Sequence, residues 1–151
     1  MRILLKHPVA MLGLLALGGC VCLGPRSDEG RMLAGKPCKD NATEAGEVYV
    51  ELIYGDKAMV AKPSAKPNTC KVKGGKTALT WYGPEDQASP FTLEFEQPLP
   101  GYRPILNSEW DRVLNRQRVT AKIGGVAEQS RHKYGIRTEW GYEDPEIIID
   151  K

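Results

Sequence analysis

Short segments of alternating apolar and polar residues recur along the second two thirds of the chain. Residues 47–54 are rich in β-branched and aromatic side chains, and in residues 91–95 three apolar residues alternate with polar ones. Further segments of this kind cover residues 57–61, 69–73, 77–82, 119–123, 133–140 and 147–149. Most of them are followed by glycine or proline, which end strands at turns. The pattern predicts an all-β domain.

One segment has helical instead of strand periodicity. Ser108 and Asp111 have the spacing of a capping box, in which a short polar side chain bonds the first amides of a helix. The apolar residues that would then share one face are Trp110, Val113 and Leu114. We predict one short helix over about Glu109–Gln117. Seven or eight strands with one small helix favour a Greek-key β-sandwich, immunoglobulin-like or cupredoxin-like, over residues 47–151.

Two proline-rich segments, residues 63–67 and 98–104, interrupt this series of strands. Proline cannot donate to a ladder of backbone hydrogen bonds. We expect both segments to be long connections that cross between two sheets. The alternative is that one of them is a loop to which a partner docks.

The first 20 residues have the plan of a secretory signal peptide. Arg2 and Lys6 make the start basic, an apolar run covers residues 8–17, and small residues with Cys20 close it. The alternative is a transmembrane anchor. However, the uncharged stretch over residues 8–24 has only 17 residues and is interrupted by glycine. A spanning helix needs about 20 mostly apolar residues.

The motif Leu17-Gly18-Gly19-Cys20 resembles the lipobox of bacterial lipoproteins. The resemblance implies that residues 1–19 are removed and that Cys20 carries fatty-acyl chains, palmitate among them, which anchor the protein permanently. Val21, and not aspartate, follows Cys20, which resembles the pattern for the outer membrane if the host is Gram-negative. A plain secreted or anchored protein is the alternative, and Cys22 is either a free thiol or a second modified site.

The residues after the lipobox change the charge balance and the domain boundary. Residues 20–46 are rich in glycine and proline and have few large apolar side chains, which indicates a lipid-anchored tether. Removing residues 1–19 takes away two basic residues and no acid, so the 21 basic and 19 acidic residues become 19 and 19. A nucleic-acid-binding protein normally has a strong basic excess, so that class is disfavoured.

The charges are nevertheless segregated along the chain. Residues 57–76 contain six bases and no acid, residues 77–102 four acids and no base, residues 103–138 eight bases and three acids, and residues 139–151 five acids and one base. One interpretation is complementary charge on neighbouring strands. The other is a basic face that meets anionic lipid, cell-wall polymer or an acidic partner.

Two cysteines remain beyond the N-terminal pair. Export permits a disulfide, and a bridge between Cys38 and Cys70 would fasten the end of the tether to the strand over residues 69–73. The alternative is two unpaired buried thiols. No Cys-x-x-Cys pair is present, so a thioredoxin-like redox role has no support.

Residues 66–81 read KPNTCKVKGGKTALTW, a strand–turn–strand pattern with a terminal aromatic residue. With residues 58–95 around it, this segment resembles the N-terminal half of cupredoxins, and the resemblance implies that fold. A blue-copper site needs two histidines, a cysteine and usually a methionine. The segments in which the resemblance places them, residues 89–91 and 136–140, contain none of these. We therefore expect no metal, no cofactor and no electron transfer.

The sequence contains little that points to catalysis. His132 has the phase of Tyr134 and Ile136, so we expect a packed, hydrogen-bonded residue, with a ligand role as the alternative. No nucleophile elbow accompanies it. We therefore predict a non-enzymatic, lipid-anchored cell-envelope protein that acts as a binding or structural module. Its expected partners are the membrane, through the N-terminal lipid, and an envelope protein or cell-wall polymer. The alternative is an envelope enzyme or enzyme inhibitor with a loop site.

Overall fold

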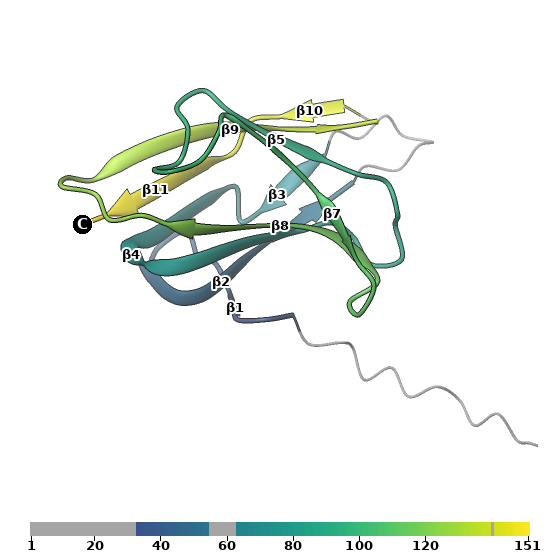
Figure 1. Ribbon diagram of the computed structural model, residues 1–151, viewed down its shortest axis with the longest axis horizontal. Helices are drawn as coiled ribbons and strands as arrows, with labels where there is room; N and C mark the ends of the chain where they lie inside the picture. The colour runs from purple at the N-terminus through teal and green to yellow at the C-terminus, as the bar shows by residue number, and fades with distance from the viewer. Residues whose placement is uncertain (1–32, 55–62, 140) are drawn as a thin grey trace, which may run out of the picture. The chain divides into compact units, whose positions relative to one another are not determined.

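The structure is a computed structural model, and it describes residues 33–54, 63–139 and 141–151. In these ranges eleven strands are present and no helix, which confirms the all-β prediction. The strands are β1 (Lys36–Pro37), β2 (Glu44–Ile53), β3 (Ser64–Lys66), β4 (Thr69–Tyr82), β5 (Thr92–Phe95), β6 (Ile105–Asn107), β7 (Glu109–Asp111), β8 (Arg116–Ile123), β9 (Ser130–Thr138), β10 (Gly141–Glu143) and β11 (Glu146–Asp150). Figure 1 shows their arrangement.

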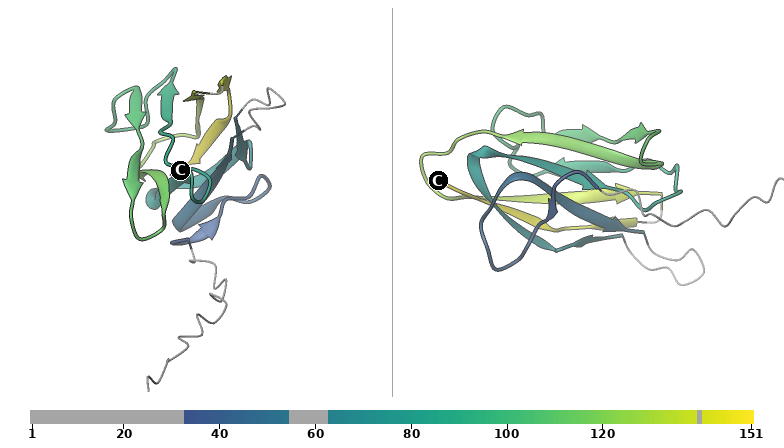
Figure 2. Two further views of the ribbon diagram at one scale, coloured as in Figure 1. Left: turned by 90° about the vertical axis from the view of Figure 1, so that its right-hand side faces the viewer. Right: turned by 90° about the horizontal axis from the view of Figure 1, so that it is seen from below.

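All these strands belong to one mixed sheet whose main path is β1-β2-β4-β11-β9-β5-β6. The sheet curls, so that β5, β9 and β10 lie over β2 and β4 like the second layer of a sandwich (Figures 1 and 2). β4 belongs to both layers. Its residues 69–73 pair in parallel with β11, and its residues 77–82 pair with β2 and with β8.

β4 changes its partners at Gly74 and Gly75. Gly75 has a φ of 69°, a left-handed conformation that favours glycine. A Cβ atom on Gly74 would lie only 3.1 Å from the carbonyl oxygen of Asp150. The pairing of β2 with β4 shifts its register opposite this point. The sequence prediction of a turn between two separate strands is therefore wrong, because the chain continues as one bent strand.

The core lies between the two layers and contains three aromatic rings in mutual contact. The ring centroids of Trp81, Phe95 and Tyr134 are 5.3 to 6.2 Å apart, and Trp81 Nε1 donates a hydrogen bond of 3.1 Å to the Tyr134 hydroxyl. Buried aliphatic side chains surround them, including Val48, Val50, Leu79, Leu93, Ile136, Ile147 and Ile149. The alternating apolar residues of the sequence thus supply the core.

The helix predicted over Glu109–Gln117 is absent, and β7 and β8 form a hairpin there. Asp111, expected in a helix cap, caps the hairpin turn: its Oδ1 accepts the N–H groups of Val113 at 2.8 Å and Leu114 at 3.0 Å. Short acidic side chains cap turns as well as helices. The apolar face of the expected helix is not buried, since 77% of Val113 and 37% of Trp110 are exposed.

The sheet begins earlier in the chain than the sequence indicates. β1 pairs in parallel with β2, and both contain residues of the range 20–46 that was assigned to the tether. The N–H of Cys38 also donates to the carbonyl oxygen of Tyr49 at 2.8 Å. Backbone hydrogen bonds, and not a pattern of apolar side chains, hold this segment in the sheet. Its glycine- and proline-rich composition therefore gives no strand signal. The folded part therefore starts before Glu47.

The proline-rich segment over residues 98–104 does not cross between the layers. It connects β5 to β6, which pair with each other in the same layer. Leu99 in this segment is buried in the core, and its carbonyl oxygen accepts the N–H of Tyr102 at 2.9 Å. The connection is thus packed against the domain.

Candidate functional site

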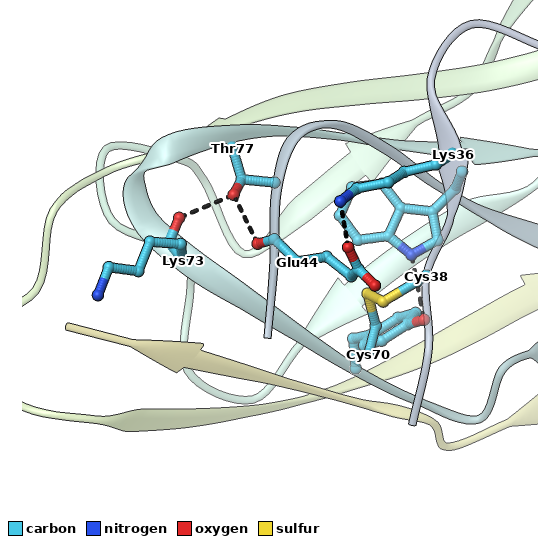
Figure 3. Close-up of a disulfide and its surroundings, with 8 residues drawn as sticks. Lys36, Cys38, Glu44, Cys70, Lys73 and Thr77 are labelled. Carbon is cyan, nitrogen blue, oxygen red and sulfur yellow. Dashed lines mark hydrogen bonds and ion pairs between the residues drawn. A yellow bond between two sulfur atoms is a disulfide. The ribbon is translucent and has the colours of Figure 1, made fainter. Parts of the chain in front are cut away.

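The structure contains the predicted bridge between Cys38 and Cys70, with the two Cα atoms 5.7 Å apart (Figure 3). It joins the residue after β1 to the second residue of β4. Both cysteines are buried. Cys20 and Cys22, the predicted lipidation site and its neighbour, lie outside the described residues.

Polar groups beside this disulfide fasten the start of β2 to the bend of β4 (Figure 3). The hydroxyl of Thr77 lies 2.8 Å from the carbonyl oxygen of Lys73 and 3.2 Å from that of Glu44. Glu44 is buried, and its carboxylate pairs with Lys36. The polar residues around the disulfide therefore hold β1, β2 and β4 together.

His132 is buried and hydrogen-bonded. Its Nδ1 lies 2.9 Å from the carbonyl oxygen of Gln97, and its Nε2 lies 3.0 Å from the hydroxyl of Ser130. It is therefore a packed core residue, as expected. Within the described ranges, no three His, Cys, Asp or Glu side chains are grouped so that they could hold a metal ion.

A groove of about 320 Å³ lies where the curled sheet remains open, between β6 and β8. Residues 105–107 of β6 form one wall, residues 118–120 of β8 form the other, and Glu109 of β7 also lines it. β6 pairs with β5 alone, and β8 pairs with β4 and β7. Among the described strands, none bridges the two walls. We take this groove as the candidate functional site.

The wall formed by β8 directs backbone groups into the groove. The N–H of Gly83 donates to the carbonyl oxygen of Gln117 at 2.8 Å, so the odd-numbered residues of β8 face β4. Even-numbered residues face the other way, because alternate residues of a strand point their backbone groups to opposite sides. The N–H of Lys122 accordingly donates to the hydroxyl of Tyr102 at 2.6 Å. The N–H and C=O of Thr120 therefore point into the groove.

The wall formed by β6 also directs backbone groups into the groove. The N–H of Phe95 donates to the carbonyl oxygen of Pro104 at 2.7 Å, so the even-numbered residues of this segment face β5. The backbone groups of Ile105 and Asn107 consequently point toward β8. Two strand edges thus face each other with hydrogen-bonding groups directed at the space between them.

The side chains along the walls differ on the two faces of the sheet. Val119 is buried on the core side, and Leu106 packs against the same core. Arg118 and Thr120 lie on the outer side and are exposed. A strand in the groove would meet apolar atoms on one face and polar, charged groups on the other.

The groove is lined by charged side chains of both signs, Arg118 and Glu109. Arg118 is 48% exposed at its side chain and pairs with Asp111 at 3.2 Å. Glu109 is the acid that lines the groove. The lining therefore carries one basic and one acidic side chain, and the basic one is already paired.

Asp111, which pairs with Arg118 of the groove lining, keeps its charge. The N–H of Leu114 donates to its carboxylate, and this bond, with the N–H of Val113 and the charge of Arg118, holds the pKa of Asp111 below its ordinary value. The hairpin that carries one end of the groove is thus fixed by a charged turn cap.

The pattern of apolar and polar residues does not predict this groove. The helix prediction covered β7 and the start of β8, and the pairing of β6 with β5 is a contact between separate segments that local periodicity does not reveal. One signal was present: two adjacent large apolar residues, Ile105 and Leu106, lie between Pro104 and Asn107, and 54% of Ile105 is exposed.

In the described ranges, no helix has the length and the apolar character needed to cross a membrane.

Comparisons of the chain with protein-family models, with curated proteins and with solved structures found no match.

Proposed function

We propose that this protein is a lipid-anchored component of the bacterial cell envelope that acts as a binding or structural module and not as an enzyme. Cys20 would carry the lipid, and the following residues would tether the β domain to the membrane. In a Gram-negative host, the domain would face the periplasm from the outer membrane. The basic start, the apolar run and the Leu-Gly-Gly-Cys motif support the anchoring.

The groove between β6 and β8 supports the binding role. Unpaired strand edges are sites at which other chains add a strand, and proteins usually cover or charge them. Here two such edges line one groove, and the backbone groups of Ile105, Asn107 and Thr120 point into it. A binding module that uses this groove needs neither metal nor cofactor.

We also infer that the domain is a Greek-key β-sandwich of the immunoglobulin-like or cupredoxin-like type. Two facing layers that share β4, with an aromatic core between them, support this inference. The second candidate, an enzyme or enzyme inhibitor with a loop site, has weaker support. The proline-rich segment before β6 is anchored by the buried Leu99.

The variant Cys20→Ala tests the anchoring. Cells that express the wild type and take up a palmitate analogue should label the protein, and the protein should sediment with membranes. The variant should lose the label and either appear in the soluble fraction or remain unprocessed. Cys22→Ser is the matched control and should keep both label and membrane association. Equal labelling of wild type and Cys20→Ala would contradict the proposal.

A further inference from the structure

We propose that a second pocket, beside the disulfide, binds the N-acetylated amino sugars of a cell-wall glycan. The pocket has a volume of about 450 Å³ and is lined by the segment over residues 37–42, the middle of β2 and the end of β3. It shares no lining residue with the groove between β6 and β8. The inference rests on the binding role proposed above, and it names the chemistry of the partner.

Tyr49 supplies a fixed aromatic surface in this pocket. It alternates with the buried residues Val48 and Val50, so its side chain lies on the outer face of the sheet. The rings of Tyr49 and Tyr82 pack edge to face, with their centroids 6.0 Å apart. Pro37 is the partner of Tyr49 in the pairing of β1 with β2, and it also lines the pocket. The C–H groups of a sugar ring can therefore stack on a tyrosine that is already held in place.

The segment over residues 37–42 is held in place as well. Cys38 is bonded to Cys70, and the N–H of Cys38 donates to the carbonyl oxygen of Tyr49 at 2.8 Å. Pro67 forms another part of the lining, and the proline ring fixes its backbone φ. A site that is rigid before binding loses less conformational entropy when the ligand enters. The pocket is therefore suited to a small ligand unit such as a sugar ring.

Asp40 and Asn41 provide hydrogen-bonding groups in the lining. Both side chains are exposed, and within the described ranges neither has a hydrogen-bond partner or an ion pair. An ionised carboxylate accepts hydrogen bonds, whereas an amide side chain both donates and accepts them. Sugar hydroxyl groups also donate and accept. The two side chains can therefore bond hydroxyl groups at the edge of a ring that is stacked on Tyr49.

The charges of the lining balance, which favours an uncharged ligand. Two basic and two acidic residues line the pocket: Lys39, Lys66, Asp40 and Glu51. Glu51 also pairs with Arg116 at 3.6 Å, but Arg116 pairs with Glu85 at 3.5 Å as well, so it adds no unbalanced charge. Complementary charge selects partners of opposite sign. This lining gives neither an anionic nor a cationic ligand that advantage.

The apolar share of the lining favours a sugar that carries an acetamido group. Pro37, Pro67 and Ala42 line the pocket together with Tyr49. One face of a plain sugar ring can cover the tyrosine but leaves other apolar surface in water, which costs free energy. An acetamido group adds a methyl group for this surface, and its N–H and C=O can bond polar side chains. The glycan strands of bacterial cell walls consist of such sugars.

The probe is the tetrasaccharide of N-acetylglucosamine, which is titrated calorimetrically into the full chain in detergent micelles. We expect it to bind. The glucose tetrasaccharide with the same linkage should bind at least about tenfold more weakly, because it lacks the acetamido groups. A proline hexapeptide tests the other class of ligand that binds to aromatic surfaces of this kind. Equal binding of the two tetrasaccharides, no binding of the first, or tighter binding of the peptide would overturn the proposal.

Three single-residue variants locate the site. Tyr49→Ala should weaken binding of the N-acetylglucosamine tetrasaccharide at least about tenfold, whereas Tyr49→Phe keeps the ring and should change it less than about twofold. Asn41→Ala removes an exposed side chain without disturbing the packing of β2, and it should weaken binding about fivefold. Tyr142→Ala on β10, outside this lining, is the matched control and should leave binding unchanged. Unchanged binding in both Tyr49→Ala and Asn41→Ala, or an equal loss in Tyr142→Ala, would refute the site.

Insoluble cell-wall glycan, freed of protein and lipid, tests the source of the ligand. The wild type should sediment with this material, and the N-acetylglucosamine tetrasaccharide should release it. Absence of sedimentation, or sedimentation that the tetrasaccharide does not reverse, would contradict the proposal. If the tetrasaccharide fails to bind a protein whose Cys20 takes up the palmitate label, this site is removed and the anchoring stands. Tetrasaccharide binding by a wild type that is never labelled would remove the anchoring alone.

Discussion

The hydrogen bond from Trp81 to Tyr134 joins the two layers of the sheet at the centre of the core. Trp81 comes from β4 and Tyr134 from β9, and both side chains are fully buried. Buried indole N–H and phenol O–H groups generally have a partner, because a buried unpaired donor costs free energy. Burial raises the pKa of Tyr134 well above its ordinary value, so the hydroxyl stays neutral.

Tyr134→Phe should destabilise the protein by about 1–3 kcal/mol. The variant keeps the ring but leaves the indole N–H of Trp81 buried without its acceptor. The free energy of unfolding is measured by urea denaturation at pH 7. Tyr142→Phe is the control, because Tyr142 is exposed and the change should alter stability by less than about 0.5 kcal/mol. Equal effects of the two variants would show that this hydrogen bond contributes nothing particular.

Asp111 gives the hairpin of β7 and β8 a dependence on pH. The pKa of its carboxyl is lowered from 3.8 in the folded protein, mainly by the N–H of Leu114. A carboxyl with a lowered folded pKa stabilises the protein fully above its unfolded pKa, and this stabilisation is lost as the pH falls through the folded pKa. The contribution of Asp111 should therefore be complete at pH 7 and should decline below about pH 4.

Asp111→Asn should lower the free energy of unfolding at pH 7 by about 1 kcal/mol. The amide oxygen can still accept the turn N–H groups, but the charge that strengthens these bonds and pairs with Arg118 is lost. The difference from the wild type should shrink as the pH falls from 5 to 2, which denaturation at several pH values would measure. A difference that stays constant over this range would rule out ionised Asp111 as its cause.

At the scale of single elements, the sequence predicts strands well where one face is buried. Residues 91–95 and 119–123 alternate strictly, and β5 and β8 occupy them. The sequence predicts secondary structure poorly where one local signal is compatible with two structures. Asp111 can cap a helix or a turn, and only the pairing of residues 109–111 with residues 116–118 decides between them. β1 has no apolar pattern that would predict a strand. It is held by its backbone pairing with β2 and by the neighbouring disulfide.

The sites differ in the same way. The bridge from Cys38 to Cys70 could be predicted because these were the cysteines left after the N-terminal pair. The groove between β6 and β8 could not be predicted, because it consists of backbone groups that every residue type carries. Its position depends on which strands remain unpaired once the sheet has curled.

Gly75 allows β4 to pass from one layer to the other, and its replacement tests that element. Gly75→Ala should cost about 1–2 kcal/mol, because its φ of 69° forces an L-residue into the left-handed region. Gly125→Ala is the matched control: no heavy atom lies within 4 Å of a Cβ atom built there. It should cost less than about 0.5 kcal/mol. Denaturation curves that coincide for the two variants would contradict a role of the bend in stability.

At the scale of the whole molecule, the disulfide connects the N-terminal segment to the strand that both layers share. β1 has two exposed residues and, among the described strands, pairs only with β2, so apolar burial contributes little to its stability. The bridge closes a segment with a sequence separation of 32 residues. In the chain-entropy model, such a cross-link stabilises the folded state by reducing the freedom of the unfolded chain.

The double variant Cys38→Ser/Cys70→Ser should lower the free energy of unfolding by about 2–5 kcal/mol, as in other small exported domains that lose a native disulfide. Changing both cysteines avoids a new free thiol, so the loss reports on the bridge. The effect should be local as well as global. The amide of residue 38 donates to the carbonyl oxygen of Tyr49 in the wild type, and its hydrogen exchange should accelerate more in the variant than exchange at the amides of β9. Cys22→Ser should leave both stability and exchange unchanged.

Mass analysis of non-reduced peptides tests the pairing itself, since the wild type must yield a linked Cys38–Cys70 peptide. Free thiols at both positions, or a link from Cys22 to either, would show that another arrangement holds this end of the domain.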